Sequence, residues 1–132
     1  MTHDDVQRWL DDYLAAWKSY DAGEIEALFS EDVEYRFYPA DEPIRGRDEV
    51  VRSWLAPEGN ESGRDTPGTY DGEYHPYAIE GSRAGAVGVS TYWSDASRST
   101  IERVYDNCWL IEFDAAGRCR SFTEYYVKQP RR

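Results

Sequence analysis

The chain has 132 residues, a formal net charge of −11 at pH 7 and an isoelectric point near 4.5. This length suits one hydrophobic core, so we expect a single domain over residues 1–132. Such an acidic chain has no concentrated basic surface for phosphate backbones, which argues against nucleic acid as a partner. The sequence has no run of about 18 apolar residues and no leader-like start, so it predicts a soluble, cytoplasmic protein with no membrane partner.

The N-terminal part of the sequence predicts three helices. Apolar residues recur with the spacing of one helical face over residues 6–17, which indicates the first helix. Asp21 followed by Glu24 resembles a capping box and predicts a short second helix that ends near Ser30. A third helix is expected within residues 46–57, because acidic residues come early in this stretch and a proline ends it.

Strands are predicted before and after the third helix. Residues 33–38 alternate between apolar and polar side chains, as a half-buried strand does. Residues 56–72 are rich in Gly, Pro, Ser and Asp and predict a long, mobile loop. Four further strands are expected at residues 73–81, 84–93, 99–113 and 118–128. The order α, α, β, α, β, β, β, β is typical of an α+β domain with helices on one face of an antiparallel sheet.

The last two strands can be placed in register from the sequence. If residues 114–117 form a four-residue turn, Trp109 lies opposite Phe122 and Asn107 lies opposite Glu124. Because side chains alternate, one face of this hairpin carries Tyr105, Asn107, Trp109, Phe122, Glu124 and Tyr126. The other face carries Val104, Cys108, Leu110, Cys119, Tyr125 and Val127.

The same register bears on the two cysteines. Cys108 and Cys119 would lie about four residues apart along the sheet, or about 13 Å at the rise of a strand, which is too far for a disulfide. Both are interpreted as reduced structural thiols. The sequence has no CxxC, HExxH or paired-histidine pattern, so no metal site and no cofactor are expected.

Three stretches of the sequence resemble the nuclear transport factor two-like superfamily, especially its SnoaL-like members. They are YLAAWKSYDAGEIEALFSEDVEYRFYP, IRGRDEVVRSWL and NCWLIEFDAAGRCRSFTEYY, and the resemblance covers nearly the whole chain. It implies a cone-shaped α+β fold in which a curved antiparallel sheet wraps around the three N-terminal helices and leaves a pocket open at one end. It also implies dimerisation through the outer face of the sheet. Isomerases, cyclases, dehydratases, epoxide hydrolases and non-catalytic binders share this scaffold, so the fold does not choose among them.

The ketosteroid isomerase branch of the superfamily matches this chain incompletely. The resemblance places Tyr13 on the tyrosine of the first helix in that branch. It places Phe37 on the catalytic base and Trp109 on the buried acid, so isomerase chemistry of that kind is not expected.

The other catalytic branches also lack a clear counterpart. Dehydratase-like and cyclase-like mechanisms use Asp or His in the pocket, and the histidines here are His3, near the N-terminus, and His75. A histidine base also needs an orienting partner, so His75 is interpreted as structural or exposed. The Asp, Arg, Asp arrangement of the epoxide hydrolase branch is not recognisable, although Arg103 shares the predicted face of Tyr105.

The expected cavity has aromatic walls and one polar cluster, which is typical of a small-molecule site. The aromatic candidates for ligand contact are Trp17, Tyr35, Phe37, Trp54, Tyr105, Trp109, Phe122 and Tyr126. Core packing is the simpler explanation for three of them, Trp17, Phe37 and Phe122. The polar candidates are Glu124, Tyr13 and Asn107, because a buried carboxylate is seldom retained for packing.

Two functions remain open at this point. The first is a binder of a small apolar or aromatic molecule. The second is an isomerase, cyclase or hydrolase in which Glu124 is the general acid or base while Tyr13 and Asn107 polarise a carbonyl. A second ionisable group next to Glu124, such as His75 or Asp41, would favour the enzyme. We also expect a homodimer through the outer sheet face, and we expect residues 56–72 to border the pocket mouth.

Overall fold

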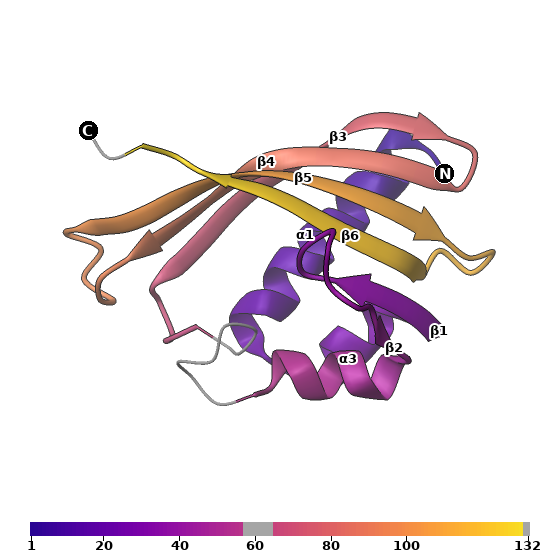
Figure 1. The fold of residues 1–132 in the computed structure, drawn as a ribbon, viewed down its shortest axis with the longest axis horizontal. Helices are drawn as coiled ribbons and strands as arrows, with labels where there is room; N and C mark the ends of the chain where they lie inside the picture. Colours follow the sequence, from indigo (N-terminus) through magenta and orange to yellow (C-terminus); the bar gives the residue numbers. More distant parts are fainter. Residues whose placement is uncertain (57–64, 131–132) are drawn as a thin grey trace.

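The computed structural model describes residues 1–56 and 65–130. Within these residues, three helices, α1 (His3–Ser19), α2 (Ala22–Leu28) and α3 (Arg47–Trp54), combine with one curved, unclosed sheet. Figure 1 shows α1 and α3 on the same side of this sheet. The predicted α+β class with a curved sheet around N-terminal helices is therefore confirmed.

The sheet contains six strands, which do not follow chain order. They are β1 (Phe29–Arg36), β2 (Ile44–Arg45), β3 (Tyr70–Glu80), β4 (Arg83–Trp93), β5 (Ile101–Phe113) and β6 (Cys119–Lys128). Their order across the sheet is β2-β1-β6-β5-β4-β3. The pair β1 and β6 is parallel, whereas the other pairs are antiparallel. The expected antiparallel arrangement is wrong at this pair, whose long connection through α3 and the strands β3 to β5 leaves room for the crossover that parallel strands need.

The helices begin where the sequence places caps. Thr2 and Asp5 form a capping box at the start of α1, and Asp21 accepts a hydrogen bond from the backbone of Glu24 at the start of α2. The second helix ends at Leu28, earlier than expected, because Phe29 has an extended backbone and opens β1. The predicted strand at residues 33–38 therefore begins four residues earlier, and the two-residue β2 was not predicted at all.

Aromatic side chains hold α1 against the concave face of the sheet. Tyr13 of α1 stacks on Phe122 of β6 at 5.7 Å between ring centroids, and it lies 4.5 Å from the ring of Trp109 on β5. Trp9 donates a hydrogen bond to the carbonyl of Leu28 at 3.0 Å, which ties α1 to the end of α2. This packing fixes the hydroxyl end of Tyr13 beneath the sheet.

The predicted register of the β5–β6 hairpin is wrong by two residues. Trp109 pairs with Glu124 and Asn107 pairs with Tyr126. One residue of the shift comes from the turn, because Phe113 pairs with Cys119 and not with Arg118, and the other comes from a bulge that adds Arg120 to β6. A shift of two residues keeps each side chain on its face, so the concave face still carries the six predicted residues.

The bulge changes the environment of one cysteine. Cys119 pairs with Phe113 and is fully buried, whereas the sequence placed it on the outer face. Cys108 lies exposed on that outer face, so it is not part of the core. Both thiols are free, as the prediction of no disulfide requires.

The predicted loop at residues 56–72 is shorter at its C-terminal end. Residues 70–72 belong to β3, which is therefore longer than the strand predicted from residue 73. Residues 57–64 lie outside the described part of the chain, and the expected mobility of the loop falls mostly there. Among the described residues, no helix is long and apolar enough to cross a membrane.

Candidate functional site

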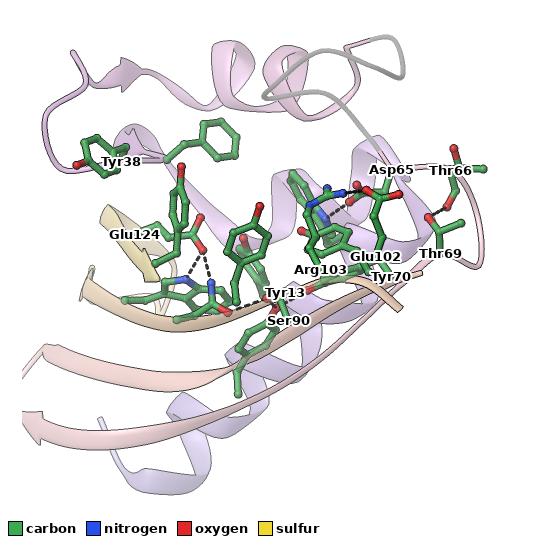
Figure 2. Close-up of a pocket in the computed structure, with 18 of the residues that line it drawn as sticks. Tyr13, Tyr38, Asp65, Thr66, Thr69, Tyr70, Ser90, Glu102, Arg103 and Glu124 are labelled. Atoms are coloured by element: carbon green, nitrogen blue, oxygen red, sulfur yellow. Dashed lines mark hydrogen bonds and ion pairs between the residues drawn. The ribbon is translucent and has the colours of Figure 1, made fainter. Parts of the chain in front are cut away.

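A cavity of about 1080 Å³ lies between the concave face of the sheet and the C-terminal part of α1. The strands β3 to β6 form its floor, and residues 37–44 and 65–70 form its rim. Figure 2 shows side chains from these separate segments converging on one space. The part of the predicted loop that the structure describes, residues 65–69, thus borders this cavity.

Most of the predicted site residues line this cavity. Eight do so: Tyr13, Trp17, Phe37, Tyr105, Asn107, Trp109, Glu124 and Tyr126. Tyr35, Trp54 and Phe122 are fully buried in the core beneath the cavity, where Tyr35 stacks on Phe122 at 4.6 Å, so their expected place in the wall is corrected. Phe122 had a simpler explanation as core, and its position agrees with it. Ligand contact by the other eight residues stays a prediction.

Glu124 is held by one of its two carboxylate oxygens. Asn107 Nδ2 donates to Oε2 at 2.8 Å, and Trp109 Nε1 donates to the same oxygen at 2.9 Å. The observed register explains both contacts, since it places Trp109 directly opposite Glu124 and Asn107 diagonally across from it. Within the described residues, Oε1 accepts no hydrogen bond, so it is the oxygen available to a ligand.

Burial makes the Glu124 carboxyl group titrate near neutral pH. Its loss of water contact raises the pKa to about 7, although the hydrogen bonds from Trp109 and Asn107 act in the opposite direction. Because Oε2 already accepts two N–H groups, the proton of the neutral form resides on Oε1. Glu124 can therefore give or take a proton at the oxygen that is free for a ligand.

A chain of buried hydroxyl groups orients the Asn107 amide. Ser90 Oγ donates to Asn107 Oδ1 at 2.7 Å, the Tyr74 hydroxyl lies 2.5 Å from Ser90 Oγ, and the Tyr70 hydroxyl lies 2.5 Å from that of Tyr74. Since the Ser90 hydrogen is committed to Asn107, Tyr74 donates to Ser90 and Tyr70 donates to Tyr74. We call Tyr70, Tyr74 and Ser90 the hydroxyl relay. It holds Asn107 with Nδ2 toward Glu124.

Two glycines make room for the central ring of the hydroxyl relay. A Cβ atom on Gly88 would lie 2.4 Å from the Tyr74 ring and 2.1 Å from the carbonyl oxygen of Glu73. A Cβ atom on Gly72 would lie 2.5 Å from the same ring. The absence of these two Cβ atoms lets the Tyr74 ring lie close to the backbone of the sheet and contact Trp109, with 4.3 Å between ring centroids.

A second polar group occupies another part of the cavity. Trp17 Nε1 donates to Asp65 Oδ2 at 2.9 Å, and the Asp65 backbone N–H donates to the Tyr20 hydroxyl at 2.7 Å. Burial raises the pKa of the Asp65 carboxyl. Figure 2 shows Arg103 beside Asp65, and the Arg103 guanidinium also lies 4.1 Å from the centroid of the Tyr92 ring. Sequence reasoning missed Asp65 because it lies within the predicted loop at residues 56–72, where no helix or strand pattern places a side chain.

A family model of the SnoaL-like domain matches residues 10–122, which is most of the chain. The chain belongs to this family. The match confirms the resemblance that the three sequence stretches indicate. No curated protein sequence matches the chain significantly.

Solved structures share the fold of this SnoaL-like domain. One is the crystal structure of a protein described as a candidate ketosteroid isomerase from Kribbella flavida DSM 17836. It has a TM-score of 0.62 and 17% sequence identity over 98% of this chain and 83% of that chain. At this identity the likeness shows the fold alone. Matches to 247 structure chains indicate that the fold is widely used, so it does not select an activity.

Neither His75 nor Asp41 forms a hydrogen bond with Glu124 in the described part of this SnoaL-like domain. His75 is exposed and is not among the cavity residues. Its Nδ1 lies 3.4 Å from Gln7 Oε1, and its Nε2 lies 3.4 Å from Glu73 Oε1. Asp41 lines the cavity, but within the described residues the hydrogen bonds to Glu124 come from Asn107 and Trp109. The hydrogen-bond partners of Glu124 in the described part of the chain are thus the neutral donors Asn107 and Trp109, and neither His75 nor Asp41 supplies the second ionisable group that would favour an enzyme.

Tyr13 is a neutral partner in this cavity. Its hydroxyl lies 3.3 Å from that of Tyr35, and burial raises its pKa well above the ordinary value. Phe37 and Trp109, which match the base and acid positions of ketosteroid isomerases, both line the cavity and cannot exchange a proton there. Among the described residues, no group of three or more His, Cys, Asp or Glu side chains is placed to hold a metal ion.

Proposed function

We propose that this SnoaL-like domain binds a small, largely apolar molecule in the cavity, with a polar group of the ligand at Glu124. The observation that carries the proposal is the free Oε1 of Glu124 on the wall of an aromatic-lined cavity. A volume of about 1080 Å³ is ample for a small organic molecule. The walls offer apolar contact and the carboxyl group fixes orientation.

Ligand screening by thermal denaturation tests this proposal. Copurifying molecules identified by native mass spectrometry, and then an apolar compound library, should give at least one compound that raises the melting temperature. Replacing Tyr105 by Ala removes a wall ring and should weaken binding of that compound about tenfold or more. Tyr77→Ala removes an exposed ring outside the cavity and should leave binding unchanged. No stabilisation by any compound would contradict the proposal.

The pKa of Glu124 favours a second candidate function, an isomerase, cyclase or hydrolase. A carboxyl group that titrates near pH 7 suits general acid or base catalysis. Tyr13 and Asn107 would polarise a substrate carbonyl, although each now donates to or pairs with a protein group. For any substrate that the protein converts, Glu124→Gln should abolish turnover while binding of an apolar ligand persists. If Glu124→Gln were as active as the wild type, a catalytic role of Glu124 would be contradicted.

The outer face of the sheet supports a homodimer as the quaternary state. Exposed apolar side chains gather there on three adjacent strands, and we call them the outer patch: Val87, Val89, Leu110, Tyr125 and Val127. A patch of this kind is costly to leave in water. A second copy of the same patch would cover it. The expected cytoplasmic location stays a prediction.

A further inference from the structure

The charges around the cavity are strongly one-sided. Among the lining residues that the structure describes, one side chain is cationic, Arg103, and five are carboxylates: Asp41, Glu42, Asp65, Glu102 and Glu124. A ligand that carries a carboxylate or phosphate would meet repulsion here. A ligand with a positive charge would meet attraction, which the net charge of −11 extends beyond the mouth.

The single lining cation is already neutralised within the protein. Arg103 forms an ion pair with Glu102, and its guanidinium lies over the ring of Tyr92. The same guanidinium lies 5.9 Å from the centroid of the Tyr105 ring. Rings of this cavity therefore already accept one positive charge on their faces, which is evidence that they suit a second.

Three tyrosines near Glu124 form an open aromatic corner. The rings of Tyr105 and Tyr126 meet at 86° with 5.4 Å between centroids, and Tyr38 meets Tyr126 at 64° and 6.0 Å. Tyr126 lies two residues after Glu124 on the same face of β6, so the carboxyl group adjoins this corner. We call Tyr38, Tyr105 and Tyr126 the aromatic corner.

Folding alone does not account for the aromatic corner. Tyr38 is 49% exposed and Tyr126 is 42% exposed, although both line the cavity. Because the rings of Tyr105 and Tyr126 meet at 86°, their electron-rich faces point in different directions. This arrangement, with a carboxylate beside it, is how proteins recognise alkylated ammonium groups.

We propose that the cavity selects an organic cation, an alkylated ammonium group on an apolar body, with its nitrogen between the aromatic corner and Glu124. The inference rests on the proposed small-molecule site and adds the chemical class of its ligand. The apolar body lies along the remaining aromatic walls. The charged head keeps contact with water at the mouth, so its desolvation is incomplete.

A pair of isosteric probes tests this inference. The (3-hydroxyphenyl)trimethylammonium ion and 3-tert-butylphenol have the same shape and differ in charge, because nitrogen in one replaces carbon in the other. Isothermal titration calorimetry on the wild-type protein at pH 7.5, where Glu124 is mostly ionised, should show the ammonium ion binding at least about tenfold more tightly. Raising the salt concentration should weaken its binding more than that of the phenol.

Variants separate the contribution of the site from the overall charge. Glu124→Gln and Tyr126→Leu should each weaken the ammonium ion about fivefold or more and change binding of the phenol less than twofold. The matched control is Glu80→Gln, which removes one charge from an 89% exposed side chain at the β3–β4 turn, outside the cavity. Glu80→Gln should change neither the affinity for the ammonium ion nor the affinity for the phenol. Tyr126→Leu keeps an apolar side chain at an exposed position, so it serves if the Glu124 variant folds poorly.

The outcomes distinguish this inference from the proposed function. If 3-tert-butylphenol bound as tightly as the ammonium ion or more tightly, the preference for an organic cation would be overturned, while an apolar small-molecule site would be supported. No binding of either probe up to millimolar concentration would overturn the inference and would also count against the proposed function. A tenfold preference for the ammonium ion that Glu80→Gln abolishes, and Glu124→Gln does not, would place cation binding elsewhere and overturn the inference.

Discussion

The Glu124 carboxyl group links stability to pH, because its pKa is raised from 4.5 to about 7 in the folded protein. Between these values the unfolded chain has released the proton and the folded chain still holds it. The free energy of unfolding must therefore fall as pH rises from about 4.5 to about 7, and the contribution is constant above that range. Tyr13, Tyr35 and Tyr70 face this charge, but their raised pKa values keep them neutral throughout.

The variant Glu124→Gln isolates this contribution. Its free energy of unfolding, relative to that of the wild type, should increase by about 2 to 3 kcal/mol between pH 5 and pH 7.5, measured by urea denaturation at several pH values. Glu80→Gln, at an exposed carboxylate, should show no comparable change. A constant difference between the Glu124 variant and the wild type would show that the carboxyl group is not perturbed by burial.

Ser90 controls the Glu124 carboxyl group through Asn107. The Ser90 hydroxyl donates to Asn107 Oδ1, and removing it in Ser90→Ala frees the amide to turn its oxygen toward Glu124. The pKa of Glu124 should then exceed the wild-type value of about 7, since a donor to the carboxylate is lost. Titration followed by NMR of the glutamate carboxyl carbon measures it. The control Thr91→Ala, on the next residue and the opposite face of β4, should leave the value unchanged.

At the scale of elements, β4 depends on a glycine beside the hydroxyl relay. Gly88→Ala would force a Cβ atom against the Glu73 carbonyl and the Tyr74 ring, and backbone cannot move aside as a flexible side chain can. We expect a loss of about 3 kcal/mol or more in the free energy of unfolding, measured by chemical denaturation. Gly85→Ala is the matched control on the same strand, because its Cβ would meet no atom within 4 Å. Similar losses in both variants would refute this account.

The sequence predicts the elements better than their exact pairing. Apolar spacing predicts α1, the Asp21–Glu24 cap predicts the start of α2, and strict alternation places Asn107, Trp109 and Glu124 on one face. The register is wrong because neither the extra residue of the turn nor the bulge at Arg120 leaves a signal in the pattern of apolar residues. From Ser121 onward each side chain keeps its predicted face because the shift is even, whereas Cys119, on the turn side of the bulge, changes face. The parallel neighbour of β1 also escapes prediction, because no local pattern encodes which distant strand will pair.

Parts of the candidate site also lie beyond sequence reasoning. Glu124 and Asn107 can be singled out as polar residues among aromatics. The hydroxyl relay cannot, because β4 turns its small residues inward and its valines outward, opposite to the usual hydrophobic alternation. The sequence pattern therefore predicts that Ser90 faces solvent. In the structure Ser90 is buried, because Tyr74 and Trp109 fill the space above β4. Asp65 reaches the cavity only through tertiary structure.

At the scale of the whole molecule, the outer patch predicts dimerisation. Leu110→Lys places a charge at a side chain that is 50% exposed in the monomer, so it should leave folding intact and convert a dimer to a monomer. Multi-angle light scattering at micromolar concentration measures the mass. Ala27→Lys, at an exposed position of α2, is the control and should remain dimeric. A wild-type protein that is monomeric under these conditions would exclude this assembly.

The parallel pair of β1 and β6 has a consequence for biosynthesis. Residues 29–36 leave the ribosome long before residues 119–128, so β1 must wait for its main neighbour until the last of the six strands has emerged. The hairpin of β5 and β6 also brings Asn107, Trp109 and Glu124 together. Pairing of β6 with β1 and β5 therefore completes the sheet and the polar site together and late in synthesis, and such long-range pairing is slow. A nascent chain therefore has no partly formed site that could capture a ligand before the domain is complete.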